Sequence, residues 1–116
     1  MIRNQWYGIL DTRQVKHGKP IGVTRMGEKL VLWRTADGQV SCIADQCCHR
    51  GASLSLGTCT HDTLACPFHG FRYDKSGRVT QIPANGKAMP VPERYHVRSW
   101  RVEDRYGFIW LWFGDP

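Results

Sequence analysis

Two short runs of this sequence each combine a cysteine with a histidine, the side chains that bind soft and borderline metal ions. The runs are Cys47-Cys48-His49-Arg50-Gly51 and Cys66-Pro67-Phe68-His69-Gly70. Together they read C-x-H, sixteen intervening residues, then C-x-x-H. Each run therefore offers one thiolate and one imidazole from a compact loop, and a glycine after each histidine lets the backbone bend closely. This symmetry predicts a site for two metal ions.

Two bridged irons need four protein ligands, and a pair of sulfurs with a pair of nitrogens is one arrangement found in 2Fe-2S clusters. One iron then takes both cysteines and the other takes both histidines. Neutral imidazoles leave the oxidised cluster without net charge, whereas four thiolates would leave it doubly negative. The reduction potential therefore rises to roughly −150 to +300 mV, against about −400 mV for plant-type ferredoxins. The expected ligands are Cys47, His49, Cys66 and His69.

Structural zinc is the alternative, because two cysteines and two histidines also form a tetrahedral zinc site, which would make the chain a zinc-binding module. Zinc modules usually pair like ligands, as C-x2-4-C with H-x3-5-H. Here cysteine and histidine alternate, and a single residue separates Cys47 from His49. The alternation favours the iron–sulfur cluster.

On these residues the chain resembles the Rieske iron–sulfur family, and within it the amino-terminal domain of Rieske non-haem iron oxygenases. The family's first box, C-P-H-R-G with a following L-S, is similar to residues 47–55, and its second box, C-P-Y-H-G-W, is similar to residues 66–71. Residues 73–77 and 109–116 are similar to the hairpin after the second box and to the passage into the catalytic domain. The resemblance covers nearly the whole chain.

The resemblance implies an electron-transfer domain that takes electrons from a reductase or ferredoxin. In such oxygenases the acceptor is a mononuclear iron in a second domain, commonly reached across a subunit boundary through a carboxylate bonded to a histidine of the second box, here His69. That iron needs two histidines and a carboxylate. The histidines outside the boxes are His17, His61 and His96, and no two of them are spaced as a ligand pair. We therefore expect no complete oxygenase site in this chain.

Residues 1–116 are expected to form a single Rieske 2Fe-2S domain, with the catalytic domain of a parent oxygenase following residue 116. The alternative within the same family is a self-contained Rieske ferredoxin that serves a separate enzyme.

Three features depart from the family's pattern. High-potential respiratory members carry a disulfide between the boxes, but Ala52 and Phe68 stand at those places here. Those members also have a serine, whose hydroxyl donates to a sulfur, where this chain has Phe71. Tyr73 stands at the position of a second hydroxyl donor in the family. Both differences imply a potential toward the low end of the class. Cys48 stands where the family usually has proline, and its side chain is expected to point away from the ligands.

Composition and charge narrow the partners. The net charge is +6, but the sixteen Lys and Arg residues are scattered, without the dense basic run that follows a phosphate backbone. We expect no nucleic acid partner. We expect a basic docking rim for an acidic redox partner, with Arg50 as its best candidate.

No apolar run is long enough for a signal peptide or a membrane span, so we expect no membrane association and a cytoplasmic location. The remaining thiols are expected to be buried, namely Cys42, Cys48 and Cys59.

The elements that position the two runs read as strands, because branched and aromatic residues cluster between turn signals. The predicted strands are residues 21–26, 29–35, 39–44, 63–65, 71–74, 78–82, 97–103 and 108–113, with the last two as a hairpin. The fold class is therefore all-β, a small antiparallel β-barrel or sandwich of Rieske type with two cluster-binding loops at one tip. The final strand is apolar on both faces, so we expect one face to contact a neighbouring domain or subunit of an oligomer.

Overall fold

The computed structural model describes residues 2–49, 51–85 and 89–115, so Arg50 lies outside the described residues. These residues form eleven strands: β1 (Gln5–Asp11), β2 (Ile21–Arg25), β3 (Glu28–Arg34), β4 (Val40–Ala44), β5 (Thr58–Thr60), β6 (Thr63–Ala65), β7 (Arg72–Tyr73), β8 (Val79–Gln81), β9 (Ser99–Trp100), β10 (Val102–Arg105) and β11 (Phe108–Phe113). The helical elements are three short 3-10 turns, η1 (Thr12–Gln14), η2 (Leu54–Leu56) and η3 (Pro83–Asn85). Among these residues, no helix is long and apolar enough to cross a membrane.

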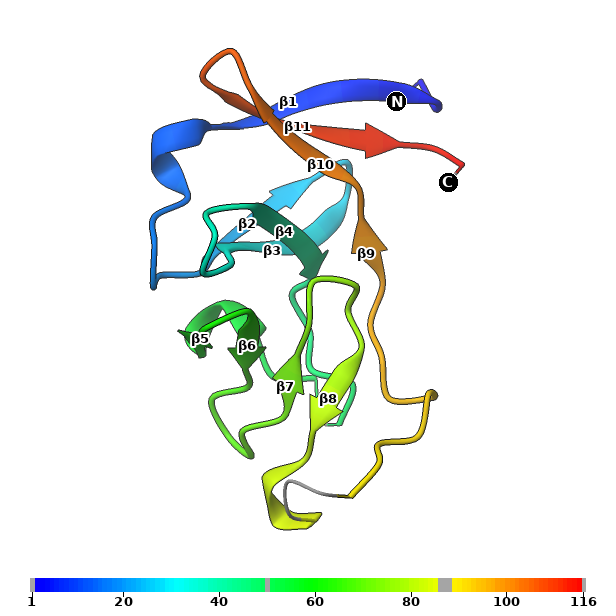
Figure 1. The fold of residues 1–116 in the computed structure, drawn as a ribbon. Coiled ribbons are helices and arrows are strands. Elements are labelled where there is room, and N and C mark those ends of the chain that lie inside the picture. The colour runs from blue at the N-terminus through cyan, green and yellow to red at the C-terminus, as the bar shows by residue number, and fades with distance from the viewer. Residues whose placement is uncertain (1, 50, 86–88, 116) are drawn as a thin grey trace.

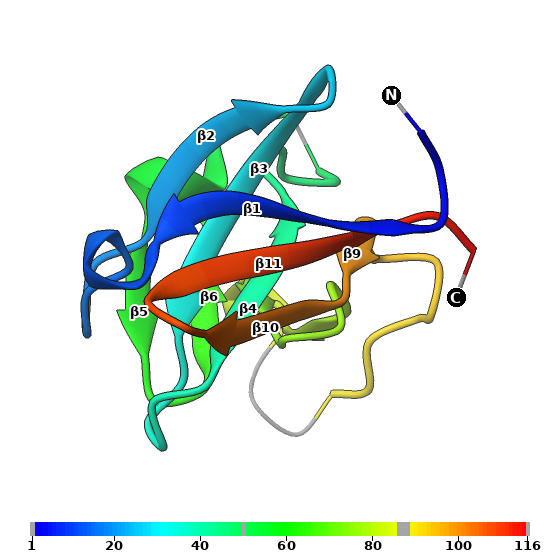
Figure 2. The same cartoon turned by 90° about the horizontal axis from the view of Figure 1, so that it is seen from above.

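The strands form three antiparallel sheets, with the orders β1-β11-β10, β2-β3-β4-β9 and β5-β6-β7-β8. Figure 1 shows the sheets following one another from top to bottom, with β2, β3 and β4 in the middle. Figure 2 shows β1, β11 and β10 side by side, crossing over the strands of the middle sheet. The antiparallel all-β fold expected from the sequence is confirmed.

The middle sheet contains β3 as an inner strand, and β3 buries apolar side chains on both of its faces. Its residues 30–33 are all fully buried, and successive side chains of a strand point to opposite faces. Leu30 and Leu32 pack with the first sheet, in a core that includes Ile109. Val31 and Trp33 pack instead with residues of the third sheet and with both box cysteines. One strand thus joins the two cores.

The two Cys-His runs are loops at the third-sheet end of the molecule. The first run follows β4 and leads into η2, and the second connects β6 to β7. Because β6 and β7 pair directly through Leu64 and Tyr73, the second loop is the tip of a hairpin. The first loop approaches from the middle sheet.

Most predicted strands agree with the structure, with two kinds of exception. Residues 97–103 do not form one strand: β9 pairs with β4 in the middle sheet, whereas β10 pairs with β11. The chain changes sheets at Arg101, whose C=O accepts the N–H of Trp112 at 2.9 Å. The sequence also failed to predict β1 and β5. β1 lacks regular alternation and contains Gly8, which is covered by the ring of Trp110, and β5 is only three residues long.

The last strand, β11, lies between β1 and β10 and so is not an edge of its sheet. Ile109 and Leu111 on its inner face are fully buried. Phe108, Trp110 and Trp112 on its outer face keep solvent exposure. Contact with another domain through this strand would therefore use its outer aromatic face.

Gly77 ties the third sheet to the segment that precedes β9. It has a φ of +84°, and its C=O accepts the N–H of Val97 at 2.8 Å. A Cβ at this position would collide with the carbonyl oxygen of Val97. We expect Gly77→Ala to lower the free energy of unfolding by about 3 kcal/mol. Urea unfolding of the loaded protein measures this loss.

Gly27→Ala is the matched control. Gly27 has a similar φ of +74°, but an added Cβ there would meet nothing within 4 Å. Only the backbone preference is lost, about 1 kcal/mol. Equal losses in the two variants would contradict the collision at Gly77.

Candidate metal centre

The first Cys-His loop is closed by backbone hydrogen bonds. The N–H of Cys47 donates to the C=O of Ala52 at 2.7 Å, and the N–H of Gly51 donates to the C=O of Cys47 at 2.9 Å. Below them, the N–H and hydroxyl of Ser55 both donate to the carboxylate of Asp45, at 2.7 and 2.6 Å. These bonds fix the loop at both ends.

The second loop repeats the same pattern. The N–H of Cys66 donates to the C=O of Phe71 at 2.9 Å, and the N–H of Gly70 donates to the C=O of Cys66 at 3.1 Å. Gly51 and Gly70 have nearly equal φ values of 70° and 71°, in the left-handed region that glycine adopts most easily. The two loops are therefore closed by the same pair of backbone hydrogen bonds, each with a glycine in the left-handed region.

Both loops face one cavity of about 300 Å³. The cysteines lie deep, since Cys47 is 3% and Cys66 is 5% exposed. The histidines are exposed, and the rings of His49 and His69 meet edge to face with their centroids 5.2 Å apart. The residues lining the cavity are Cys47, His49, Ala52, Cys66, Phe68 and His69. The structure thus brings together all four donors predicted from the sequence.

The chemistry of these donors fits a two-iron cluster, because two thiolates and two imidazoles can be divided between two irons. A 2Fe-2S cluster spreads its ligands over two metal positions. The cavity has roughly the volume of ten water molecules in the liquid, which is room for such a group.

Tyr73 is fully buried beneath the first loop. Its O–H lies 3.2 Å from Sγ of Cys47 and 3.2 Å from Sγ of Cys48, and its oxygen accepts the N–H of Cys48 at 2.8 Å. Two causes raise the pKa of Tyr73 far above its ordinary value: burial is the larger, and the hydrogen bonds with the two cysteines add to it. The phenol therefore stays protonated and serves as a hydrogen-bond donor, as the sequence indicates.

The sulfur of Cys66 accepts hydrogen bonds from backbone N–H groups, unlike that of Cys47, which lies beside the Tyr73 hydroxyl. Burial raises the pKa of the Cys66 thiol, and hydrogen bonds from the N–H groups of Phe68 and His69 act in the opposite direction. Donors aimed at a sulfur stabilise its negatively charged form. They suit a thiolate that binds metal.

The ring of Phe71 sets the plane of the His49 imidazole. The two rings stack with centroids 4.9 Å apart and an interplanar angle of 19°. Phe71 is only 6% exposed and also meets Tyr95 edge to face at 6.4 Å. The sequence indicated only that Phe71 replaces a serine of other family members, because no local pattern predicts that its ring stacks on His49.

The other cysteines and histidines lie outside the cavity. Cys42 is fully buried, and burial raises its pKa to about 12. Cys59 is half-buried, but Cys48 is exposed, so the expectation of a buried thiol is wrong there. Cys48 lines a neighbouring hollow and not the cavity of the donors. The remaining histidines are all exposed, and none lines the cavity: His17, His61 and His96.

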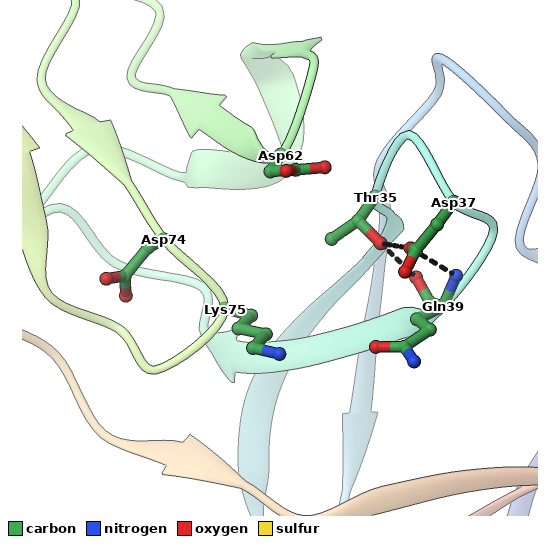
Figure 3. A pocket seen from close by; sticks show the side chains of 6 residues that line it. All are labelled: Thr35, Asp37, Gln39, Asp62, Asp74 and Lys75. Carbon is green, nitrogen blue, oxygen red and sulfur yellow. Dashed lines mark hydrogen bonds between the residues drawn. The ribbon is translucent and has the colours of Figure 1, made fainter.

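A second hollow gathers carboxylates where three hairpin turns meet (Figure 3). It carries Asp37, Asp62 and Asp74, with Lys75 among them. Each of these carboxylates already accepts a backbone N–H of a turn. They cap turns, so we assign this hollow a structural role.

The sequence profile of the Rieske 2Fe-2S domain matches residues 5–101. The chain belongs to the Rieske family. A Rieske-type 2Fe-2S cluster is therefore its cofactor, and the zinc alternative is set aside. Electron transfer is the role that such a domain has in oxygenase components.

Several relatives of this Rieske domain are oxygenase components. The chain is 37% identical over 115 residues to the oxygenase component of dicamba O-demethylase from Stenotrophomonas maltophilia, covering 99% of this chain and 33% of that protein. It is 36% identical over 114 residues to the vanillate O-demethylase oxygenase subunit of a Pseudomonas species, covering 97% and 30%. The crystal structure of dicamba monooxygenase superposes with a TM-score of 0.89 at 37% identity, covering 100% of this chain and 36% of that one. The chain thus spans about a third of these relatives.

Phe71 and Phe68 provide a matched pair in one loop. Phe71 is buried against His49, so Phe71→Ser should leave a cavity and cost about 3 kcal/mol of unfolding free energy. Phe68 is 74% exposed, so Phe68→Ser should change that free energy by less than about 0.5 kcal/mol. Urea unfolding of the loaded protein measures both, and similar losses would refute the packing role of Phe71.

Proposed function

We propose that this Rieske domain relays single electrons from a reductase or ferredoxin to the mononuclear non-haem iron of an oxygenase catalytic domain. The observation that carries the proposal is the change in solvent exposure across one cavity. The two cysteines that line it are buried, and the two histidines that line it are exposed. Electrons can then enter and leave through imidazole edges, which meet a partner first. The cysteines stay shielded from water.

The same change in solvent exposure supports the ligand assignment. Cys47 and Cys66 would hold the inner iron, and His49 and His69 would hold the outer one. When bound, the cluster supplies one-electron chemistry. The chain's own residues do the rest: Tyr73 and the backbone N–H groups of the second loop donate to the sulfurs, and Phe71 fixes one imidazole plane.

We assign His69 as the residue through which electrons leave the cluster. It lies beside Phe68, which is 74% exposed and lines the same cavity. An apolar ring at the mouth would be covered when a partner docks, and covering it would exclude water from the imidazole edge. A carboxylate of the acceptor that bonds to the free nitrogen of His69 would complete the route, as in the oxygenases that the chain resembles.

The relatives support the choice of acceptor, because their names are those of oxygenase components and this domain matches about a third of their length. We propose that a catalytic domain follows residue 116 in the parent polypeptide and that it lies in the same or a neighbouring subunit. The outer aromatic face of β11 is the surface we assign to contact with that domain or with another subunit of an oligomer.

Metal analysis tests the cofactor directly. The purified, anaerobically handled chain should be red-brown and should hold two irons and two acid-labile sulfides. Chelation of the iron should lower the thermal unfolding midpoint by more than about 5 °C, because metal binding contributes to folding free energy. A colourless protein with one zinc would refute the proposal.

His69→Cys tests the ligand assignment through charge. A thiolate in place of a neutral imidazole adds negative charge to the cluster, so its reduction potential should fall by more than about 100 mV. Redox titration followed in the visible spectrum measures the change. His17→Cys adds the same thiol at an exposed position outside the cavity and should leave the potential unaltered. An unchanged potential in His69→Cys, with both irons retained, would exclude His69 as a ligand.

A further inference from the structure

The hydroxyl of Tyr73 has one proton and two sulfur neighbours. Sγ of Cys47 and Sγ of Cys48 lie at the same distance from the phenol oxygen, 3.2 Å. A phenol donates one hydrogen bond. The two sulfurs therefore share a single donor, and the share that one receives is lost to the other.

The two sulfurs differ in their surroundings. Cys47 is buried among apolar residues and faces the cavity of the four donors. Cys48 is exposed and does not line that cavity; it lines a neighbouring hollow that Cys47 also borders, together with His96 and Arg98. Tyr73 is fully buried, and its hydroxyl contacts both the exposed thiol of Cys48 and the sulfur of Cys47 that faces the cavity.

We propose that Cys48 is a positioning residue that draws the Tyr73 proton away from Cys47 and so lowers the reduction potential of the cluster. The inference rests on the proposed assignment of Cys47 as a ligand. A hydrogen bond to a ligand sulfur stabilises negative charge, and the reduced cluster carries one more negative charge than the oxidised one. Any part of that bond diverted to Cys48 therefore favours the oxidised state.

The backbone allows the sulfur of Cys48 to be tested alone. The phenol oxygen also accepts the N–H of Cys48, at 2.8 Å, and this bond does not need the side chain. In Cys48→Ala the phenol thus keeps its backbone partner and loses only the competing acceptor. Tyr73→Phe removes the shared donor while keeping the buried ring.

The experiment is a double-mutant cycle read as the midpoint potential of the loaded protein. Cys48→Ala should shift the equilibrium constant for reduction several-fold toward the reduced state, where tenfold corresponds to about 59 mV for one electron. The same substitution in a Tyr73→Phe background should cause no shift. Cys59→Ala, which removes a half-buried thiol that makes no hydrogen bond to Tyr73, should leave the potential unchanged.

An unchanged or lower potential in Cys48→Ala would overturn the inference, and so would an equal shift in both backgrounds. Resonance Raman spectra give a second measurement that does not need Tyr73→Phe. The deuterium shift of the Fe–S(Cys) stretching bands should grow in Cys48→Ala, because Cys47 then receives the whole bond, and no growth would also overturn it. A wild-type protein without a two-iron spectrum would refute the proposed function as well, whereas a normal spectrum with an insensitive potential refutes this inference alone.

Discussion

A cluster shared by two loops requires that the loops keep a fixed separation, and the rest of this structure depends on that constraint. Each loop meets it first on its own, through the pair of backbone hydrogen bonds that joins its cysteine to the residues four and five positions further on. The same pair of backbone hydrogen bonds therefore closes each loop. Packing then sets the distance between the loops, because Cys47 and Cys66 belong to one apolar core with Trp33 and Leu64.

The same packing arranges charge. Burying two sulfurs would be costly without donors, since unpaired negative charge in an apolar core is strongly unfavourable. Tyr73 and the N–H groups of the second loop meet that need from below. The histidines need no such support, because a neutral imidazole can bind metal and remain at the surface. The order from buried sulfur to exposed nitrogen is thus a solvation requirement, and it supports the proposed passage of electrons through the imidazole edges.

The sequence points to the four side chains that line the cavity because their spacing is local, and it predicts β2, β3, β4, β6 and β11 because each is bounded by turn signals. It fails where long-range contacts decide. Residues 97–103 look like one strand, yet they divide between two sheets at Arg101. The stack of Phe71 on His49 crosses from one loop to the other, and the hydrogen bond from Tyr73 to Cys48 joins residues 25 positions apart. Such contacts follow from sheet packing, which no local pattern contains.

The position of Phe68 completes the argument about direction. Phe68 is 74% exposed and lines the cavity beside His69, the proposed ligand, so most of its apolar surface stays in water in the isolated domain. Its neighbour Phe71, two positions after His69, is buried and holds the other imidazole in place. One aromatic ring of the loop therefore serves the domain's own core. For the other we propose a role when a second surface covers it, because covering Phe68 would also exclude water from the neighbouring His69.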